Sequence, residues 1–386
     1  MKVLHVTSNI DPMSGGPARA LMGLVLAQQR AGIECGIFST WQGTLDRAFF
    51  RTFRCANVPV GLVGPCRAPF KRHPDLVAGL EVAMQGAEFV HIHALWEEVQ
   101  HRAAIIARER GIPYLFRPCG MLDPWSLSQR KLGKGLYIEM RLRRDINRSA
   151  GLHFTSEEEK VQASPLKFTA SSLVVENGVD LEEFRTMPPR GSFRAGVEAI
   201  ADRRMILSLS RIHPKKGFDL LIPAFAKAQL QNTILVIAGS DDVGYMPTLL
   251  SLVEQHGVKD RVVFTGQLDS RRRLEALADA DLFVLPSYQE NFGIAVVEAA
   301  AAGLPCIISR NVNIQAEIVR AGAGDVVDLD ANDLAEKLKA WMADDQRRSE
   351  AGRRARDFAF QRFDWDPIGR RWRDEYERII REERRR

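Results

Sequence analysis

The sequence predicts an α/β protein with two doubly wound parallel-sheet domains, and three observations support this prediction. First, the chain has 386 residues, which exceeds the usual size of one domain. Second, short apolar runs alternate with helical patterns along the chain, which is typical of parallel sheets covered by helices. Third, an irregular and basic segment at 186–204 interrupts this alternation. We therefore place a domain boundary between Asn177 and Arg204.

The first series of elements begins with an apolar strand at 3–7. A loop that contains Gly15 and Gly16 follows, and then a helix at 17–29. This loop lacks the Gly-x-Gly-x-x-Gly pattern of dinucleotide-binding folds, although its glycines would let a phosphate or sugar approach the backbone. The segment 42–75 has little periodicity and several prolines, so we expect a surface loop there. Further strands are expected at 33–38, 88–93, 113–116 and 173–176.

The second series also alternates strands and helices, which predicts a doubly wound parallel sheet. We expect residues 1–178 and residues 179–364 to form the two domains. The final helix, 365–386, is expected to pack back on the first domain. Strands of the second domain are expected at 205–210, 233–238, 262–265, 281–285, 304–308 and 325–328.

The composition restricts the classes of function. The net charge of +5 is mild, and no single element has the dense basic patch of a nucleic-acid-binding protein, so we expect no nucleic-acid partner. The five cysteines include no Cys-x-x-Cys pair, which argues for a reducing compartment and against a zinc ribbon or disulfide framework. The amino terminus has a strand pattern rather than that of a signal peptide, and no run of 18 apolar residues occurs. These features favour a cytoplasmic protein.

The segment from Asp281 to Ser309 has the pattern most specific for a function. Its strand leads into a polar loop that contains Glu290, and the helix expected from Ile294 carries Glu298. Backbone N–H groups at the start of a helix bind anions, and Gly293 has no side chain to block them. Amides suit phosphate and carboxylates suit sugar hydroxyls, so the segment predicts a phosphorylated ligand that is rich in hydroxyl groups.

Three more loops are expected at the same edge of the sheet, because the carboxyl ends of parallel strands meet there. One contains Arg211, whose guanidinium can bind two phosphate oxygens, and Lys216, which offers a point charge. Two cations and a helix start would hold a diphosphate. The other two loops contain Gly239 and the pair Gly266 and Leu268, where backbone groups can contact a nucleobase.

These residues resemble the signature of glycosyltransferase family 4, whose members are retaining nucleotide-sugar glycosyltransferases with the GT-B fold. The resemblance implies two Rossmann-like domains that face each other across a cleft. Residues 1–178 would form the acceptor-side domain, and residues 179–364 would form the domain that binds the nucleotide-sugar donor. Two glutamates eight residues apart are a weak signal alone, but the surrounding glycines, the proline and the upstream cations make the pattern specific. The resemblance covers the whole chain, through Gly15-Gly16, His91-Ile92-His93, Glu176-Asn177-Gly178-Val179-Asp180, Arg211, Lys216-Gly217, Glu290-x-Phe292-Gly293-x4-Glu298-Ala299-x-Ala301-x-Gly303-x-Pro305 and Phe363-x-Trp365.

The resemblance implies roles for the site residues. Arg211 and Lys216 would neutralise the leaving diphosphate, and Glu298 would bind the ribose. Glu290 would hold the donor sugar, and Gly16 would let the first domain close on the donor. The family usually needs no metal, so we expect no metal and no cofactor. The catalytic residues implied are Glu290, Arg211 and Lys216, and the donor-binding residues are Gly15, Gly16, Asn291, Phe292, Gly293, Glu298, Gly239, Gly266 and Leu268.

One loop departs from the family pattern. Members often carry a histidine just before the glycine of the loop after the strand at 113–116, where this chain has Cys119 and Gly120. Arg117 or Cys119 could replace that histidine, or the backbone could suffice, and a buried inert thiol is the preferred interpretation of Cys119. The residues proposed for a sugar or acceptor loop in the first domain are His93, Arg117, Cys119 and Gly120.

The expected function is a hexosyltransferase that moves a sugar from a UDP- or GDP-linked donor to a glycan or lipid-linked acceptor. The loop around Cys119 also resembles that of some bacterial exopolysaccharide transferases, which favours a role in cell-surface polysaccharide synthesis. The alternative is a catalytically silent GT-B protein with a binding or regulatory role, which the missing histidine favours. A nicotinamide-dependent dehydrogenase is disfavoured, because neither domain has the dinucleotide fingerprint.

Metal sites have weak support in the sequence. His91 and His93 share one face of a strand, but no further ligands follow nearby, so a metal pair is the weaker interpretation. Asp-x-Asp pairs, which metal-dependent transferases use, begin at Asp279, Asp328 and Asp364. Such pairs are frequent by chance in a chain with 49 acidic residues.

A helix expected at 130–148 has Leu132, Leu136 and Met140 in one stripe among seven basic residues. A basic amphipathic helix can lie on an anionic membrane, which would bring the protein to the inner face of a membrane. A helix that packs this stripe and exposes its charged face is the preferred interpretation, with peripheral membrane association as the second.

Overall fold

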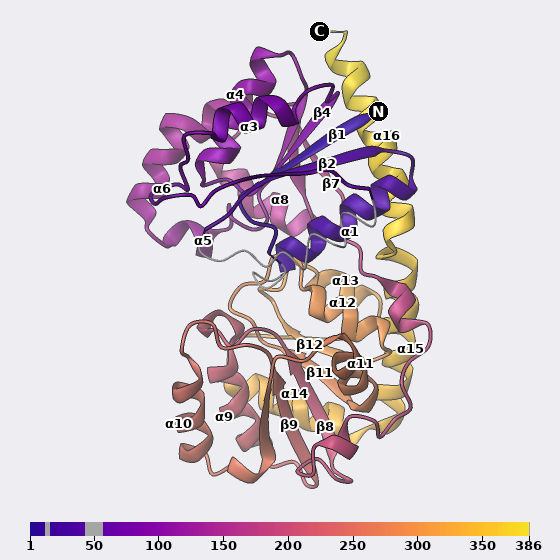
Figure 1. Cartoon of the computed structure of the whole chain (residues 1–386). Helices are drawn as coiled ribbons and strands as arrows, with labels where there is room; N and C mark the ends of the chain where they lie inside the picture. The colour runs from indigo at the N-terminus through magenta and orange to yellow at the C-terminus, as the bar shows by residue number, and fades with distance from the viewer. Residues whose placement is uncertain (12–15, 43–56, 386) are drawn as a thin grey trace. The chain divides into compact units, whose positions relative to one another are not determined.

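The computed structural model describes residues 1–11, 16–42 and 57–385. The chain forms two compact units, Met1–Gly178 with Trp365–Arg386, and Val179–Asp364 (Figure 1). Each unit contains one parallel sheet with helices on both faces. The prediction of two doubly wound parallel-sheet domains is therefore confirmed. None of the described helices combines the length and the apolar character that a membrane-spanning helix requires.

The sheet of the first unit has the strand order β3-β2-β1-β4-β5-β6-β7 in the described part of the chain, and every pair is parallel. Chain order reverses between β1 and β4, so the loops that follow these two strands flank the switch point. The strands are β1 Lys2–Thr7, β2 Glu34–Thr40, β3 Val60–Val63, β4 Phe89–His93, β5 Tyr114–Arg117, β6 Gly151–Phe154 and β7 Ser172–Val174.

Alternate side chains of these strands enter two separate cores. On one face, Leu24 and Trp372 belong to a core formed with α1 and α16. On the other face, Val99 and Ile146 belong to a core formed with α3, α4, α7 and α8. The helices are α1 Gly16–Arg30, α3 Leu76–Ala83, α4 Glu98–Glu109, α5 Pro124–Ser128, α6 Lys131–Tyr137, α7 Arg143–Asn147, α8 Glu157–Ala163 and α16 Trp365–Glu383.

Two elements of the first unit differ from the prediction. Strand β3 lies inside the predicted loop 42–75, because a four-residue edge strand with half-buried side chains is too short to show an alternating pattern. The predicted helix 130–148 is divided into α6, a π-helical turn at Ile138–Leu142, and α7. Gly133 and Gly135 weaken α6, since glycine is a poor helix former.

The packing of this helical stretch also differs from the preferred interpretation. Its core-facing side chains are Ile138, Leu142 and Ile146, all of which are buried. The predicted packing stripe is exposed instead, because Leu132, Leu136 and Met140 retain 90%, 63% and 71% of their accessible surface. The interpretation of that stripe as a packed face is therefore wrong.

The sheet of the second unit has the strand order β10-β9-β8-β11-β12-β13, and all its pairs are parallel. Its chain order reverses between β8 and β11. The strands lie within one or two residues of their predicted positions, because their near-continuous apolar runs are typical of strands buried on both faces. They are β8 Arg204–Leu209, β9 Thr233–Ala238, β10 Val262–Gly266, β11 Leu282–Leu285, β12 Cys306–Ser309 and β13 Gly324–Val327.

Helices cover both faces of this second sheet. Phe225, Leu249 and Leu338 come from α9, α10 and α14 and share one core. Leu277 and Ala355 lie with α12 and α13 in the core of the opposite face. The helices are α9 Phe218–Ala228, α10 Met246–Gln255, α11 Ser270–Asp279, α12 Ile294–Ala301, α13 Gln315–Arg320, α14 Ala331–Ala343 and α15 Asp345–Arg362.

The irregular segment 186–204 belongs to the second unit. The buried carboxylate of Asp279 accepts hydrogen bonds from the backbone N–H groups of Phe193, at 2.9 Å, and Arg194, at 2.8 Å. These bonds attach the segment to the carboxyl end of α11. The two ends of the unit also pair, since the N–H of Val179 donates to the carbonyl of Phe363 at 2.8 Å.

Helix α16 packs back on the first unit through close contacts with glycine. Figure 1 shows α16 in yellow beside α1. A Cβ atom at Gly23 of α1 would lie 2.4 Å from the indole of Trp365, and a Cβ at Gly178 would also lie 2.4 Å from that ring. Only glycine allows the buried indole to approach both backbones this closely.

We expect Gly23→Ala to destabilise the first unit by about 1–3 kcal/mol, because the added methyl group overpacks the contact with Trp365. The measurement is the thermal midpoint of the first unfolding transition. Gly135→Ala is the matched control, since a Cβ there meets no atom within 4 Å and alanine favours the helix. Equal effects of the two substitutions would contradict the proposed packing.

Candidate active site

Two of the three residues predicted to be catalytic meet at the switch point of the second sheet. Lys216 ends a short 3-10 turn, Pro214–Lys216, in the loop after β8, and Glu290 lies in the loop after β11. Their side chains form an ion pair, and the exposed fraction of each side chain is 20% or less. In open α/β sheets, ligands bind at this position outside the carboxyl ends of the strands.

The loop after β8 has a conformation that places Lys216 toward the neighbouring loop. The Nδ1 atom of His213 accepts a hydrogen bond from the N–H of Lys215 at 3.1 Å and so caps the turn. Gly217 follows with φ of 72°, and a Cβ there would lie 2.0 Å from the carbonyl oxygen of Pro286. Glycine therefore allows the loops after β8 and β11 to touch.

The loop after β11 is fixed from its other side by backbone hydrogen bonds to the loop after β12. The N–H of Glu290 donates to the carbonyl of Asn311 at 2.9 Å, and the N–H of Asn313 donates to the carbonyl of Glu290 at 3.0 Å. The carboxylate is thus held by a rigid backbone as well as by Lys216. The charged groups of the site are therefore in position before a ligand binds, so that binding requires little rearrangement of them.

The electrostatics of this region favour an anionic ligand. Burial disfavours the ionised form of Glu290, but the charges of Lys216, Lys215 and Arg211 outweigh it and lower the pKa of the carboxyl. The pKa of His213 is lowered by burial and by the same three cations, so this ring is neutral near pH 7. Arg211 is half exposed, and the carboxylate of Asp242 lies 3.9 Å from its guanidinium.

Helix α12 begins as the sequence predicts, with Gly293 as its N-cap. Gly293 has φ of 78° and ψ of 56°, a left-handed conformation that favours glycine. Phe292 is buried, and its ring packs edge-on against Phe363 with the ring centroids 5.5 Å apart. The side chain of Phe292 therefore serves the core, and its backbone is the part that remains for a ligand. Asn291 lies between Glu290 and this helix start.

Glu298, predicted to bind ribose, has a partner that the sequence analysis missed. Its carboxylate forms an ion pair with Arg273 of α11, and Arg273 also pairs with Glu183. The two glutamates thus share one cation. A ligand that binds Glu298 must displace Arg273 or share it.

The remaining donor-side residues lie at the same edge of the sheet. The N–H of Gly239, after β9, donates to the carbonyl of Gly266 at 2.9 Å, so the two loops are in contact. A Cβ at Gly239 would lie 1.8 Å from the carbonyl oxygen of Ser210, which joins the loop after β8 to this group. The side chain of Leu268 packs against the core. Contact of this backbone with a nucleobase remains a prediction.

The first unit holds the other predicted residues at the carboxyl edge of its sheet. Gly16 is exposed and begins α1, whereas Gly15 lies outside the described residues. Arg117 ends β5 and is buried, with its guanidinium donating to the side-chain oxygen of Asn177. The predicted acceptor loop follows directly.

The turn at Cys119 and Gly120 is held by a buried carboxylate that the sequence analysis missed. Glu159 of α8 accepts hydrogen bonds from the N–H of Gly120 at 2.7 Å and from the N–H of Thr155 at 2.7 Å. The thiol of Cys119 is partly exposed in the structure and lies 3.6 Å from the carbonyl of Arg117. Desolvation raises the pKa of this thiol, which favours the protonated, weakly nucleophilic form.

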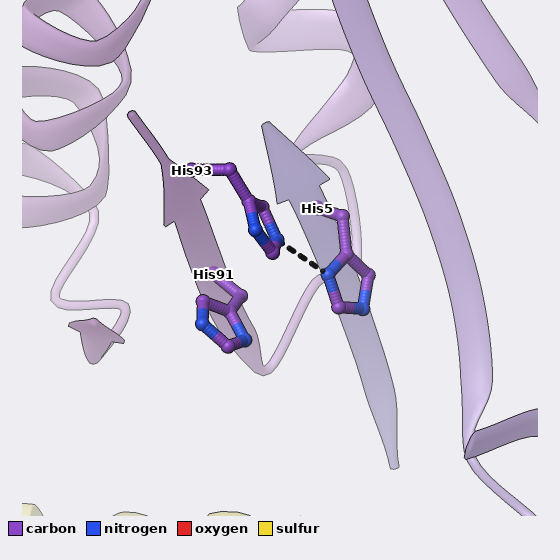
Figure 2. Close-up of side chains that lie close together, drawn as sticks. All are labelled: His5, His91 and His93. Atoms are coloured by element: carbon purple, nitrogen blue, oxygen red, sulfur yellow. Dashed lines mark hydrogen bonds between the residues drawn. The ribbon is translucent and has the colours of Figure 1, made fainter. Parts of the chain in front are cut away.

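His93 lies in the core rather than in the acceptor loop. Residues of β4 alternate between faces, so His91 and His93 both point toward α16. Figure 2 shows His93 beside His5, with the Nε2 of His93 3.0 Å from the Nδ1 of His5. The ring of His93 is therefore occupied by a core hydrogen bond, and this side chain does not extend into the loop after β5.

Four buried histidines form one hydrogen-bonded chain whose direction can be assigned. The carbonyl of Val175 only accepts, so His153 must carry its proton on Nε2, 2.9 Å away. The Nδ1 of His153 then accepts from the Nε2 of His91 at 3.2 Å, and the Nδ1 of His91 accepts from the hydroxyl of Tyr376 at 2.7 Å.

The same direction continues through Gln28 of α1. Its Nε2 donates to the hydroxyl of Tyr376 at 3.0 Å, and its Oε1 accepts from the Nε2 of His5 at 2.8 Å. The Nδ1 of His5 is then free to accept from His93. All four rings are thus neutral Nε2–H tautomers, and the chain attaches α16 and α1 to β1, β4 and β6.

Among the described residues, His5, His91 and His93 form the group of histidine, cysteine, aspartate or glutamate side chains close enough to hold a metal ion together. The hydrogen bonds above already engage these rings. Burial lowers the pKa values of these rings, and the positive charge of Arg117 lowers them further and would also repel a cation. We therefore assign the cluster to the core.

The Asp-x-Asp pairs have structural partners. Asp279 holds the segment 186–204, and Asp281 accepts from the N–H of Met205 at 2.7 Å. Asp330 caps α14 through the N–H of Asn332 at 2.8 Å. The third pair lies at the start of α16, where Asp366 bonds Arg30 at 2.7 Å.

Comparison with known proteins gives a family for the second unit. Residues 190–358 match the family described as Glycosyl transferases group 1. D-inositol 3-phosphate glycosyltransferase of Xylanimonas cellulosilytica is 32% identical over 205 residues, which are 50% of this chain and 48% of that protein. A GDP-mannose-dependent alpha-(1-6)-phosphatidylinositol monomannoside mannosyltransferase of Mycolicibacterium smegmatis is 28% identical over 204 residues, 50% and 53% of the two chains. The chain thus spans about half the length of the curated relatives it matches.

Solved structures match over nearly the full length. HepE of Anabaena in complex with UDP-glucose has a TM-score of 0.80 at 20% identity, covering 98% of this chain and 99% of that chain. Sucrose-phosphate synthase from Thermosynechococcus elongatus has a TM-score of 0.78 at 20% identity, with the same coverage. At this identity the likeness establishes the fold.

The two sheets and these structural neighbours define a protein with the GT-B fold. Residues 190–358 match the group 1 glycosyltransferases, and this match agrees with the kind of family expected from the sequence.

We expect the first unit to lose stability as pH falls from about 6.5 toward about 4, because burial lowers the pKa of His5 to about 4 and lowers those of His91, His93 and His153. In this range the unfolded chain binds protons that the folded chain excludes, so the free energy of unfolding decreases by up to ~1.4 kcal/mol per pH unit for each histidine. Thermal midpoints measured across this range check the prediction.

His5→Gln removes one of these titrating groups, so its stability should depend less steeply on pH than that of the wild type. His256→Gln is the control, because His256 lies at the carboxyl end of α10, outside this cluster. An unchanged pH dependence in His5→Gln would contradict the assignment of a neutral ring.

Proposed function

We propose that the protein is a retaining glycosyltransferase of family 4 that moves a sugar from a UDP- or GDP-linked donor to a glycan or lipid-linked acceptor. The observation that carries the proposal is the ion pair of Lys216 and Glu290 at the switch point of the second sheet. Arg211 and the start of α12 lie on the loops beside it. Cations, a carboxylate and a helix start match the diphosphate and hydroxyl groups of such a donor.

The chemistry follows from the charges at this edge. The bond between the anomeric carbon and the diphosphate oxygen breaks, and a bond from the acceptor oxygen to that carbon forms. The acceptor proton passes to the departing phosphate oxygen in a front-face reaction. Lys216 and Arg211 stabilise the charge that develops on this oxygen, and the carboxylate of Glu290 holds the sugar.

Two ion pairs at the proposed donor site involve groups that a donor would also bind. Lys216 neutralises Glu290 in the structure, and a donor phosphate would compete for this cation. Arg273 neutralises Glu298 in the same way, and ribose hydroxyls would compete for that carboxylate. Lys216 and Arg273 thus keep the charges of Glu290 and Glu298 paired, which avoids the cost of an isolated, desolvated ion.

Relatives support the class of donor and acceptor. One of them is described as GDP-mannose-dependent and acts on a phosphatidylinositol monomannoside, and one structural neighbour was solved with UDP-glucose. A metal-independent reaction, cell-surface polysaccharide synthesis and a cytoplasmic site of action remain part of the proposal.

A catalytically silent binding protein is the second candidate, and the loop at Cys119 is the observation that favours it. Burial raises the pKa of the Cys119 thiol, which lies 3.6 Å from the backbone carbonyl of Arg117, so it does not provide the proton-transfer group that a histidine would. Turnover measured with purified protein and a panel of sugar nucleotides separates the candidates, since a silent protein binds a donor without consuming it.

We expect Lys216→Ala to reduce kcat roughly 10²–10³-fold, because one preorganised contact to developing charge is removed. Glu290→Gln should also abolish most transfer while preserving the shape of the loop. Steady-state kinetics measure both effects, and thermal midpoints verify that the variants fold. Lys339→Ala is the control, since Lys339 forms an exposed pair with Glu336 on α14. A Lys216→Ala variant with the wild-type rate would contradict the site.

A thermal-shift screen with UDP-, GDP- and ADP-sugars identifies the donor base. A donor present at 100 times its Kd stabilises the folded state by about 2.7 kcal/mol, and the cognate nucleotide should produce the largest shift. Lys216→Ala should reduce this shift for the cognate donor only. Stabilisation by none of the three nucleotides would argue against a nucleotide-sugar site.

A further inference from the structure

The helical stretch from α6 to α7 has an apolar surface that the fold does not use. Leu132 and Met140 are the two most exposed large hydrophobic side chains in the described part of the chain. Leu136 lies between them, four residues from each, so the three share one side of the helix. The core contacts of this stretch come from a separate stripe, Ile138, Leu142 and Ile146.

The charges around this surface are positive and unpaired. Arg130, Lys131, Arg144 and Arg148 are exposed, and none of them has an ion-pair partner among the described residues. The acidic side chains of the same stretch are already engaged: Glu139 pairs with Arg143 at 2.6 Å, and the buried Asp145 binds Arg108 at 2.9 Å.

The three other basic residues on this stretch are engaged within the fold. Lys134 is half-buried and donates to the carbonyl of Ser126. Arg141 pairs with Glu98 of α4 at 3.0 Å, and Arg143 is held by Glu139. The sequence alone assigns all seven cations to one solvated face, whereas the structure separates the paired ones from the free ones.

The helical stretch that carries this apolar surface follows the loop after β5 closely in the sequence. That loop, with Cys119 and Gly120, leads into α5, whose first turn is capped by Asp123 through the N–H of Ser126 at 2.7 Å. Trp125 in this turn retains 38% of its exposure. A molecule held at α5 and α6 is therefore next to the proposed acceptor loop.

We propose that Trp125, Leu132, Leu136 and Met140, together with Arg130, Lys131, Arg144 and Arg148, form a surface that docks on an anionic lipid bilayer. We call it the α5–α6 surface. Apolar side chains in a row insert at the boundary of the acyl chains, and unpaired cations bind anionic headgroups. A lipid-linked acceptor would reach the loop after β5 from this bilayer, and this last step alone rests on the proposed function.

Charge complementarity selects a bilayer over a second copy of the chain. The free charges beside the apolar row all have the same sign, so two copies that cover this face against each other would bring like charges together. An anionic bilayer instead supplies the opposite charge across the whole surface. Salt should weaken the attraction, because these cations are exposed.

The test is co-sedimentation of the full chain with vesicles, in the absence of any sugar donor. We expect binding to phosphatidylcholine vesicles that contain phosphatidylglycerol, and binding roughly tenfold or more weaker to pure phosphatidylcholine. The triple variant Leu132→Ser, Leu136→Ser, Met140→Ser should lose binding by roughly tenfold or more, and Arg130→Glu with Lys131→Glu should lose the preference for phosphatidylglycerol. These side chains are exposed, so the variants should keep the wild-type thermal midpoint.

Matched variants elsewhere on the chain control for general changes in hydrophobicity and charge. Val82→Ser, Val243→Ser and Leu250→Ser replace three exposed apolar residues that retain 65%, 55% and 48% of their surface. Lys259→Glu with Arg353→Glu reverses two exposed charges. Both controls should bind vesicles as the wild type does.

Three results would overturn the docking surface. The first is that the wild type binds neither kind of vesicle, and the second is that the matched controls lose as much vesicle binding as the variants of the α5–α6 surface. The third is that the triple serine variant changes its oligomeric mass but not its vesicle binding, which would show that a second copy covers this face. The assay contains no donor and no transfer step. Failure of docking and failure of sugar transfer are therefore observed separately.

Discussion

The ion pair of Lys216 and Glu290 joins the two loops between which the strand order of the second sheet reverses. Two half-buried charges at a loop contact are costly unless they pair with each other, so this pair requires the two loops to keep their relative positions. Gly217 permits the contact by leaving room for the carbonyl of Pro286, and the bonds between Glu290 and the loop after β12 fix it from the far side. The arrangement of the donor-side residues depends on this one contact.

Much of the second unit can be predicted from sequence, because strands buried on both faces leave unbroken apolar runs and because glycine marks both ends of α12. The chain order of charged loops then places Lys216 and Glu290 at one edge without further information. Strand β3 escapes such reasoning, since four half-buried residues at a sheet edge leave no distinct period. Gly133 and Gly135 can be read in the sequence as weak helix formers, but the π-helical turn that follows Tyr137 has no sequence pattern of its own.

The parts of the site that sequence could not supply are contacts between distant residues. Arg273 neutralises Glu298 from another helix, and Glu159 holds the turn at Gly120 from 39 residues away. The period of two places His91 and His93 on one face, but it cannot show that Tyr376 and Gln28 cover that face. Because His93 is polar and lies at the end of a strand, the sequence suggested that it belongs to the acceptor loop. In the structure His93 is buried, on the face of the sheet that α16 covers.

The return of α16 to the first unit has a consequence for the order in which the chain folds. The first unit needs Trp372 and Tyr376 to complete one of its two cores, and these residues leave the ribosome after all of the second unit. The second unit is continuous in sequence and pairs its own two ends, so it can close while the first unit still lacks a face. Until α16 emerges, the nascent first unit would expose its buried histidines to water. The emergence of α16, rather than of residue 178, would therefore be the event that commits residues 1–178 to their final structure.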